Sequence, residues 1–323
     1  TDQIITVPID QAIGATSVVV NAGCVRNRGV EGSARFQPVK TKEFEWTISA
    51  NWSKNWNKLV ELADGVAMWN LNPNITVGGN IYIRAYPGTE LGRLYGRGYE
   101  RAPEGAFYVD ADGSYVDCSN QIVVDAETGS ARLTSTEDEL LDLGSIYPDW
   151  TAGMSHSLSY KGFRLGLSFS AQWGGKTYSM THFALAYQGK LKNSLKGRYA
   201  GMIVPGVNLN ENGTYSKNTT ITTDIVDHYT NYVYARENAE ENVFDTSFLK
   251  LKELRLEYSL PRHLCSKTRV FQGITVGVYA TNLFCWTNFP LYDPEAGYAV
   301  GSSISRGIEA GAYPMTRTYG INL

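Results

Sequence analysis

The sequence lacks a long apolar run, a surplus of basic residues and the common catalytic motifs. None of its apolar stretches approaches the roughly 20 residues of a membrane-spanning helix, so any crossing of a bilayer would have to use β-strands. The formal net charge of −3 argues against a nucleic-acid-binding protein, which requires a basic face. No GxSxG, HExxH or P-loop pattern occurs. We therefore expect neither an enzyme nor a nucleic-acid-binding protein.

Cysteine is also scarce. The four cysteines, Cys24, Cys118, Cys265 and Cys285, lie far apart and form no CxxC pair. A Cys24–Cys118 disulfide and free, buried thiols are both compatible with this spacing. The chain starts at Thr1 with neither a methionine nor a signal peptide. We expect that such a segment has been removed or that the sequence is part of a longer protein.

Glycine (32 residues) and tyrosine (21 residues) are abundant, which suits an all-β protein rich in turns. The clearest β pattern runs from Pro148 to Tyr178. Apolar residues occupy nearly every second position over Trp150–Tyr160 and again over Phe163–Trp173, and Lys161-Gly162 forms a tight turn between them. The alternate positions hold small and polar residues. The pattern predicts a hairpin with one apolar face that is aromatic at both ends.

Six further segments have strand character, which makes about eight strands in the chain. They are Asp2–Pro8, Val30–Gln37, Phe44–Trp52, Thr246–Leu260, Ile274–Phe284 and Tyr313–Leu323. In Thr246–Leu260 the apolar phase slips by one residue, which predicts a bulge near Lys252-Glu253. Residues 177–188 and 261–268 are expected to form short helical segments.

Long and short connections alternate between these strands. Short turns are expected near residues 40–42, 161–162 and 261–272, and the long connections comprise about residues 9–28, 55–147, 175–243 and 287–312. Outer-membrane barrels sort their connections in this way, with long extracellular loops and short turns on the other side. The apolar face would meet lipid and the polar face the lumen. The expected fold is therefore all-β, the antiparallel wall of a transmembrane β-barrel.

Seven blocks of the sequence, in this order, resemble the C-terminal part of the SusC/RagA family of TonB-dependent outer-membrane transporters of Bacteroidota. The blocks are DQIITVPID, VNAGCVRNRGVE, PVKTKEFEWTISANWSKNWNKLVEL, PDWTAGMSHSLSYKGFRLGLSFSAQWGGKTY, DTSFLKLKELRLEYSLP, ATNLFCWTNF with YDPE, and YPMTRTYGINL. Together they extend along nearly the whole chain. The resemblance is specific because seven ordered blocks are hard to obtain by chance.

The resemblance implies more than the residues themselves show. Such transporters are barrels of roughly 22 strands with a plugged lumen, so residues 1–323 would form about the last eight strands, without the plug or the N-terminal strands. The implied function is TonB-dependent uptake of a nutrient across the outer membrane, most often an oligosaccharide and sometimes a peptide. The implied partners are a SusD-type surface lipoprotein over the long loops, TonB acting through the plug, and outer-membrane lipid.

Acidic residues and histidines could suggest catalysis or metal binding. Carboxylates are paired at Asp110/Asp112 and Asp125/Glu127 and cluster in Glu137–Glu139. A glycosidase pair would need a cleft and one raised pKa, whereas loop tips need only water. A loop calcium site at Asp110 and Asp112 is the alternative, although the glycine after Asp112 comes too early for an EF-hand. The four histidines have no ligand spacing, and His156 falls on the predicted lipid face. We expect no catalytic residue, no metal and no cofactor.

The candidate substrate-binding residues lie in the longest loop and on the polar face of the strands. Aromatic rings of the loop could stack on sugars or form the small core of the loop itself; the candidates are Trp69, Tyr82, Tyr86, Tyr95 and Tyr99. The lumen-facing candidates Arg164, Gln172 and Arg255 could line the solute path or meet the plug.

Two other interpretations remain open at this point. A soluble or surface-attached all-β glycan-binding protein would also be rich in turns and tyrosine, but it would leave the aromatic faces of residues 44–52 and 163–173 in water. A complete eight-stranded barrel would account for the strands but not for the resemblance. The sequence does not identify the substrate or the residues that contact the lipoprotein.

Overall fold

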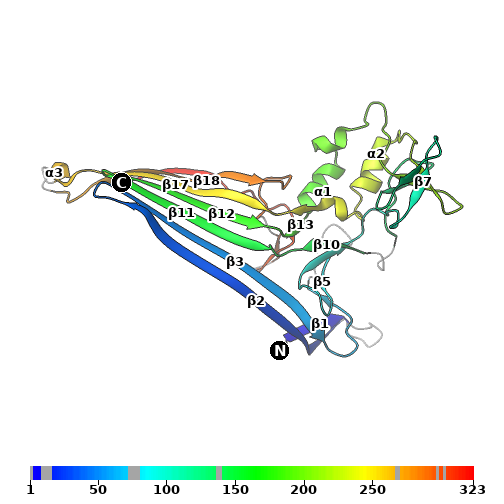
Figure 1. Ribbon diagram of the computed structural model, residues 1–323, viewed down its shortest axis with the longest axis horizontal. Coiled ribbons are helices and arrows are strands. Elements are labelled where there is room, and N and C mark those ends of the chain that lie inside the picture. Colours follow the sequence, from blue (N-terminus) through cyan, green and yellow to red (C-terminus); the bar gives the residue numbers. More distant parts are fainter. Residues whose placement is uncertain are drawn as a thin grey trace.

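An eight-stranded antiparallel sheet, called the wall, dominates the computed structural model, which describes residues 3–8, 17–71, 81–135, 140–265, 270–295, 298–300 and 303–323. Its strands lie side by side in chain order (Figure 1). They are β1 (Gln3–Pro8), β2 (Ser17–Lys40), β3 (Phe44–Leu62), β11 (Trp150–Tyr160), β12 (Phe163–Trp173), β17 (Phe248–Ser259), β18 (Thr275–Thr287) and β22 (Thr318–Asn322). The predicted all-β, antiparallel architecture is confirmed.

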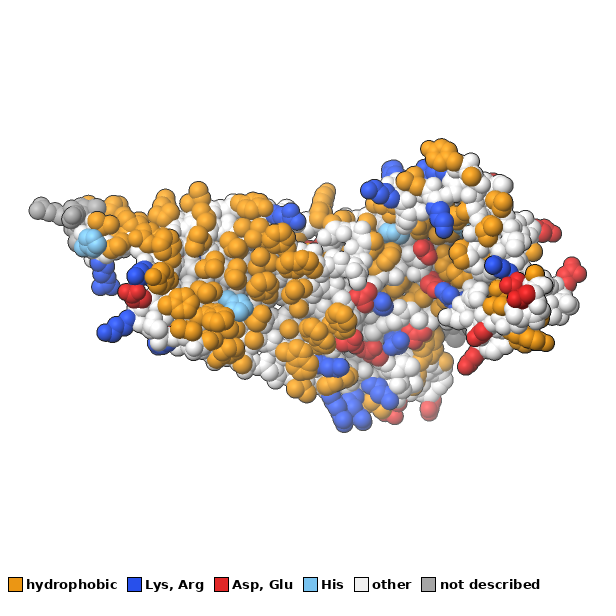
Figure 2. Space-filling model, turned by 45° about the horizontal axis from the view of Figure 1, so that its top comes forward, with side chains coloured by type: hydrophobic (Ala, Val, Ile, Leu, Met, Phe, Trp, Pro, Cys, Tyr) orange, Lys and Arg blue, Asp and Glu red, His pale blue; other side chains and the backbone are white. Residues whose placement is uncertain are grey.

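The wall is a single layer with two different faces. β11 pairs with β12 residue for residue and with β3 on its other side. Because side chains alternate along a strand and paired residues share a face, the apolar residues of neighbouring strands gather on one side, the outer face (Figure 2). Its exposed members include Phe36, Trp52, Met154, Tyr160, Phe163, Trp173, Leu249, Leu256, Val278, Phe284 and Trp286. His156 also lies on this face, where its ring stacks on Trp46 with centroids 6.0 Å apart.

The bulge predicted in β17 is present. The pairing of β17 with β12 shifts register between Leu251 and Glu253, which makes Lys252 an extra residue relative to β12. The pairing of β17 with β18 is irregular at the same point. Leu251 and Leu254 therefore both face outward in spite of their odd spacing. Helix α3 (Arg262–Cys265) follows β17 within the segment predicted to be helical.

Two of the predicted loop boundaries are wrong. The sequence predicts a loop over residues 9–28, but β2 begins at Ser17 and pairs with β3 from Gly23 onward, while residues 9–16 lie outside the described residues. β3 likewise continues to Leu62, beyond the predicted start of the next loop at residue 55. Residues 17–28 mix valine, which favours strands, with glycine and asparagine, which disfavour them, and pairing with β1 and β3 fixes the segment as a strand.

The long connections meet at one end of the wall, and the short turns and α3 lie at the other (Figure 1). The described residues of 63–149, 174–247 and 288–317, which follow β3, β12 and β18, are called the head. This separation is the one that the alternating connection lengths predict.

The head contains short strands and helices. Its sheets are β10 (Leu141–Ser145), β6 (Arg93–Gly96), β5 (Ile81–Ala85) and β4 (Trp69–Asn70); β16 (Val243–Asp245), β13 (Lys176–Ser179) and β21 (Ile308–Glu309); β15 (Tyr215–Lys217), β14 (Val207–Leu209) and β9 (Val123–Val124); β7 (Phe107–Val109) with β8 (Tyr115–Asp117); and β19 (Tyr298–Val300) with β20 (Ser303–Ser305). The helical segments are α1 (Met180–Tyr187), inside the predicted range, α2 (Ile225–Asp227), η3 (Lys192–Leu195), η4 (His228–Val233) and η5 (Glu240–Asn242).

The three long connections fold together as one body. Two parallel pairings join them, β9 with β14 and β13 with β21. One buried apolar cluster draws on all three connections; its members are Ile81, Ile83, Leu94, Tyr178, Ala239 and Ile308. Beside it the fully buried carboxylate of Glu309 accepts hydrogen bonds from the hydroxyls of Ser179 (2.6 Å), Thr181 (2.6 Å) and Tyr292 (3.0 Å). The head thus has a core of its own.

One hairpin occurs twice in the head, one hundred residues apart. β7–β8 and β14–β15 close on turns with the same hydrogen bonds, from the N–H of Asp110 to the carbonyl of Ser114 and from that of Asn210 to that of Thr214, both 2.9 Å. Tyr108 of the first hairpin packs on the face of the second hairpin that carries Val207 and Tyr215, and Val207 is completely buried there. The corresponding face of the first hairpin, with Phe107, Val109 and Tyr115, stays exposed.

Candidate functional site

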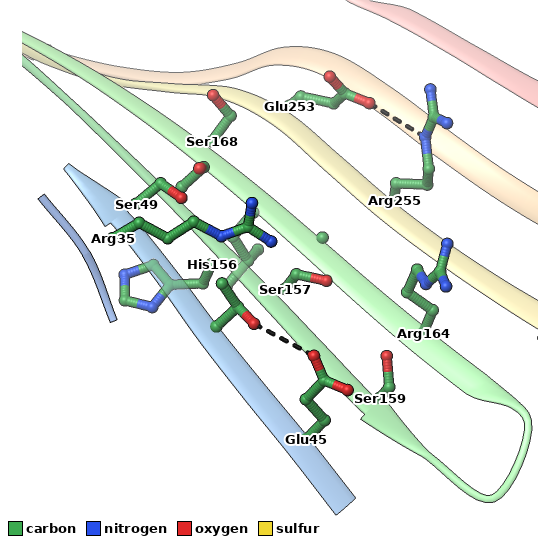
Figure 3. A pocket seen from close by; sticks show the side chains of 14 residues that line it. Arg35, Glu45, Ser49, His156, Ser157, Ser159, Arg164, Ser168, Glu253 and Arg255 are labelled. Atoms are coloured by element: carbon green, nitrogen blue, oxygen red, sulfur yellow. Dashed lines mark hydrogen bonds and ion pairs between the residues drawn. The ribbon is translucent and has the colours of Figure 1, made fainter. Parts of the chain in front are cut away.

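The inner, polar face of the wall carries a hollow of about 650 Å³, called the inner hollow. β2, β3, β11, β12 and β17 contribute to it, and two of the predicted lumen-facing residues, Arg164 and Arg255, border it (Figure 3). Its lining comprises Arg35, Glu45, Thr47, Ser49, Ser155, Ser157, Ser159, Arg164, Gly166, Ser168, Glu253 and Arg255, together with His156 and Leu167, whose side chains point to the outer face.

Short side chains form the floor of the inner hollow. The register places Ser49, Ser155 and Ser168 side by side on three adjacent strands. The same row continues to Arg35 on β2 and to Glu253 on β17. The middle of the row therefore offers hydroxyl groups and its two ends offer charges. Because serine side chains are short, the space above the floor is open to a solute.

The charged groups at the border differ in how far they are already paired. Arg255 lies 3.1 Å from Glu253 and 3.5 Å from Glu257, measured between side-chain nitrogen and oxygen atoms. Arg35 and Arg164 make no hydrogen bond or ion pair with any residue that the structure describes. A guanidinium presents five donors in a rigid plane, which suits a carboxylate or a row of hydroxyls. The inner hollow can therefore bind a polar or anionic group.

A second polar surface lies in the head, where three of the predicted tyrosines share one face of the β10-β6-β5-β4 sheet. Tyr82 is the cross-strand partner of Tyr95, and the ring of Tyr86 meets that of Tyr95 edge-on at 5.4 Å. The guanidinium of Arg84 lies 4.0 Å from the centroid of the Tyr82 ring. Burial raises the pKa of Tyr95, so its hydroxyl remains a hydrogen-bond donor at neutral pH. We call this surface the tyrosine face.

Trp69 and Tyr99, predicted alongside these tyrosines, lie elsewhere. Trp69 pairs with the buried Ala85 and so belongs to the opposite, core-facing side of the sheet. Tyr99 is only 8% exposed, and its hydroxyl donates to Glu241 at 3.0 Å. It packs in a core cluster with Val124, Ala131 and Val204. The ring of Tyr99 thus serves as loop core, the alternative that the sequence left open, and it has almost no surface for a sugar.

Gln172, the third predicted lumen-facing residue, lies outside the inner hollow. Its side-chain amide donates to the carbonyl (3.2 Å) and hydroxyl (3.0 Å) of Thr246 and so ties β12 to the segment that precedes β17. Sequence reasoning missed Arg35, Glu45 and Glu253 as members of the hollow. Their polar phase is visible in the sequence, but their neighbours depend on the register between strands.

The loop acids and the cysteines show no assembled site. Asp110 and Asp112 accept hydrogen bonds from the N–H groups of Ala111 (2.8 Å) and Ser114 (2.9 Å), which is turn chemistry. Among the described residues no three of histidine, cysteine, aspartate and glutamate gather closely enough to hold a metal. Residues 137–139 lie outside the described residues. Cys24, Cys118 and Cys285 are free, so Cys24 and Cys118 form no disulfide. The absence of a cofactor and the alternative of loop calcium stay predictions.

In the described part of the chain, no helix combines the length and the apolar character needed to cross a bilayer. No protein-family model matches the sequence. TonB-dependent receptor P26 of Formosa agariphila is 28% identical over 100% of the chain, and TonB-dependent receptor P3 of the same organism is 26% identical over 98% of it. SusC of Bacteroides thetaiotaomicron is 22% identical over 94%. The chain spans 31%, 30% and 26% of the length of these three relatives.

Solved structures support the same relationship at the level of the fold. The structure of the RagAB peptide transporter matches 99% of this chain with a TM-score of 0.67 and 20% identity, and the match covers 31% of that chain. The RagAB peptide importer in its closed-closed state matches with a TM-score of 0.63 and 21% identity. These relatives are named as receptors and transporters, which supports the prediction that the chain is not an enzyme. Along nearly its whole length the chain is similar to proteins named TonB-dependent receptor and SusC, and it has the fold of part of the RagAB peptide transporter, as its sequence blocks predict.

Proposed function

We propose that the wall stands in an outer membrane, with its outer face toward lipid and the inner hollow toward the lumen of a larger barrel. The division of the eight strands into an apolar and a polar face carries this proposal. β11 and β12 have 11 residues each. At about 3.3 Å per residue and a tilt of about 40°, such a strand rises roughly 28 Å, which matches the apolar band of about 25 Å of outer-membrane barrels.

The activity proposed for the whole receptor is TonB-dependent uptake of a nutrient. Relatives named TonB-dependent receptor and SusC, together with the RagAB fold, support this activity. A SusD-type surface lipoprotein is the proposed partner of the head, because the head occupies the end of the wall that carries the long loops. TonB would act through a plug domain, to which the inner hollow would be adjacent.

An oligosaccharide is the first candidate substrate. The row of serine hydroxyls in the inner hollow and the tyrosine face of the head supply the hydrogen bonds and aromatic rings that a sugar requires. A peptide is the second candidate. It is favoured by the unpaired guanidinium groups of Arg35 and Arg164, since a peptide carries a terminal carboxylate and a neutral oligosaccharide does not. The fold of a peptide importer points in the same direction.

The test uses the full-length receptor that contains this chain, produced in its host. Uptake of labelled oligosaccharides and of labelled peptides is compared between normal cells, cells without the receptor, and cells treated with a protonophore. We expect receptor-dependent uptake of one of the two classes and its loss when the membrane is de-energised. Absence of receptor-dependent uptake for both classes, or recovery of the receptor in the soluble fraction, would refute the proposal.

A paired-arginine variant then separates the two substrate classes. Replacing Arg35→Gln and Arg164→Gln together should lower the uptake of substrates with a carboxylate by about tenfold or more, and that of neutral oligosaccharides by less, because a charge-assisted hydrogen bond is about twice as strong as a neutral one. Arg262→Gln in α3, at the opposite end of the wall from the head, is the matched control. Equal effects on both classes would remove the argument for the peptide.

A further inference from the structure

A groove of about 450 Å³ opens on the outer face of the wall, next to the head. Its sides are formed by the indole rings of Trp150, Trp173 and Trp286 together with Leu249, and Ala171 forms its floor. The polar residues Ser247, Thr287 and Asn288 lie at the end of the groove toward the head, and Gln172 and Phe248 complete its lining. We call it the tryptophan groove.

The strand register explains why a groove exists at this level. Trp150 lies opposite Trp173, and their rings stack with centroids 6.4 Å apart and planes 7° apart. In the next row Ala171 lies opposite Leu249, which lies opposite Trp286. The short side chain of Ala171 therefore leaves a gap between the stacked tryptophans on one side and Trp286 on the other.

The apolar sides of the groove are not covered by any described part of the chain. Trp173 is 59% exposed and Trp286 is 52% exposed. An apolar cavity of about 150 Å³ already accommodates benzene, so this groove has room for several links of a hydrocarbon chain. The groove is also continuous with the apolar outer face, which extends over the strands away from the head (Figure 2).

The end of the groove toward the head is polar, and a ligand that fills the groove must match this end as well. The hydroxyl of Thr287 donates to the carbonyl of Ser247 at 2.8 Å, and that of Ser247 accepts from the N–H of Gly174 at 2.8 Å, so both already have partners. The side-chain amide of Asn288 is exposed and has no partner among the described residues. Tryptophan rings with a polar neighbour on one side and apolar surface on the other are typical of the membrane–water interface.

We propose that the tryptophan groove holds one acyl chain of a membrane lipid, with the lipid headgroup at Asn288. The proposal rests on the proposed function, because it requires the outer face to lie in a bilayer. It goes beyond that function, since a lipid held at one defined place differs from the general contact of a barrel with its solvent. The acyl chain would lie on Ala171 between Trp173 and Trp286 and would cover the indole surface that is otherwise exposed.

The experiment counts lipids on the full-length receptor. The receptor is extracted from outer membranes in a mild detergent and washed extensively, and native mass spectrometry gives the number of lipids that stay bound. Ala171→Leu, which fills the floor, should remove one bound lipid per receptor. Ala50→Leu is the matched control, because Ala50 lies on the same face opposite Met154 but not in the groove, and it should leave the number unchanged.

A second variant guards against a folding defect in the first. Trp286→Ala removes one side of the groove without adding bulk and should also release the lipid. Folding of each variant is checked by the heat-dependent mobility of the intact barrel in gels. If folded Ala171→Leu and Trp286→Ala both keep the lipid, or if the normal receptor holds only detergent, the groove proposal is wrong. Failure to find the receptor in outer membranes would instead refute the proposed function.

Discussion

The wall and the head differ in where their apolar side chains lie: those of the wall are exposed on one face, and those of the head are buried in a core. In the wall, Trp173 and Phe284 are 59% and 54% exposed, and no described segment covers the outer face. In the head, Leu94 and Ile308 are completely buried. Both regions contain antiparallel strands, so strand pairing alone does not account for the difference. The proposed function accounts for it by the surroundings of each region, a bilayer for the wall and water for the head.

This difference bears on the soluble glycan-binding interpretation that the sequence left open. A protein folded in water would have to cover a face as large and as apolar as that of the wall with a second layer. The strands and helices of the head could form such a layer, but the head lies beyond the end of the wall strands (Figure 1). The outer face is therefore available to lipid along the strands.

The largest effect is expected for a cavity in the head. Leu94→Ala removes a completely buried side chain from the cluster that joins all three long connections, and such changes cost about 2–5 kcal/mol. Limited proteolysis and hydrogen exchange of the full-length receptor should show a loosened head and an unchanged wall. Leu195→Ala, at an exposed position of the head, is the control. Equal loosening of the wall would contradict the independence of the two regions.

A charge on the outer face should affect the wall and spare the head. Leu167→Arg places a cation near the middle of β12 on the apolar side, where an arginine at the bilayer midplane costs about 2–4 kcal/mol. Folding of the full-length receptor into lipid vesicles measures this cost. Ser168→Arg, the next residue but on the inner face, should cost far less. If both variants lose the same stability, the assignment of the two faces is wrong.

A smaller effect is expected at the buried carboxylate of the head. Glu309→Ala leaves the hydroxyls of Ser179 and Thr181 without their acceptor, and an unsatisfied buried group costs about 1–3 kcal/mol. Hydrogen exchange of β13 and β21 should rise because the two strands are joined at this point. Glu309→Gln, which keeps an acceptor oxygen, should retain more of the protection than Glu309→Ala does.

The smallest effect concerns pH. Burial lowers the pKa of His182, against an opposing hydrogen bond to Asn242, and burial likewise lowers the pKa of His228. Neutral imidazole is thus favoured in the folded head, and this contribution to stability is present above pH 6.5 and is lost as the pH falls through the lower folded values. Protease resistance of the head should decline on acidification. His182→Gln should reduce the decline, and an identical pH response would contradict the role of His182.

The strands of the wall could be predicted because the alternation of apolar and polar residues that specifies them lies within each strand. The hairpin of β11 and β12 has the bounds that the alternation of residues predicts, and the bulge at Lys252 follows from a visible slip in phase. The start of β2 could not be predicted, since the first residues of Ser17–Arg28 pair with β1 and the rest with β3, and the sequence does not reveal these partners. The length of β3 was hidden for the same reason.

The candidate site was only partly accessible from the sequence. Arg164 and Arg255 are recognisable because they lie on the polar side of amphipathic strands, but Arg35 joins them only through the register across β3, β11 and β12. In the head the sequence gives no pairing rule. Tyr95 and Tyr99 look alike along the chain, yet one lies on an accessible face and the other is core. Whether each ring is accessible or buried depends on contacts with residues far away in sequence, such as that of Tyr99 with Glu241.

The two parallel pairings of the head also fix when the head can form. A hydrogen bond from Asn208 at β14 to Val124 of β9 joins positions 84 residues apart, and one between β13 and β21 joins positions 130 residues apart. Closing such distant contacts is slow, because the entropy of the intervening chain is lost before the contact is gained. β21 comes from the last long connection, so a chain released before Ile308 is made lacks the strand that completes this sheet. The head can therefore be completed only after Ile308 and Glu309 have been made.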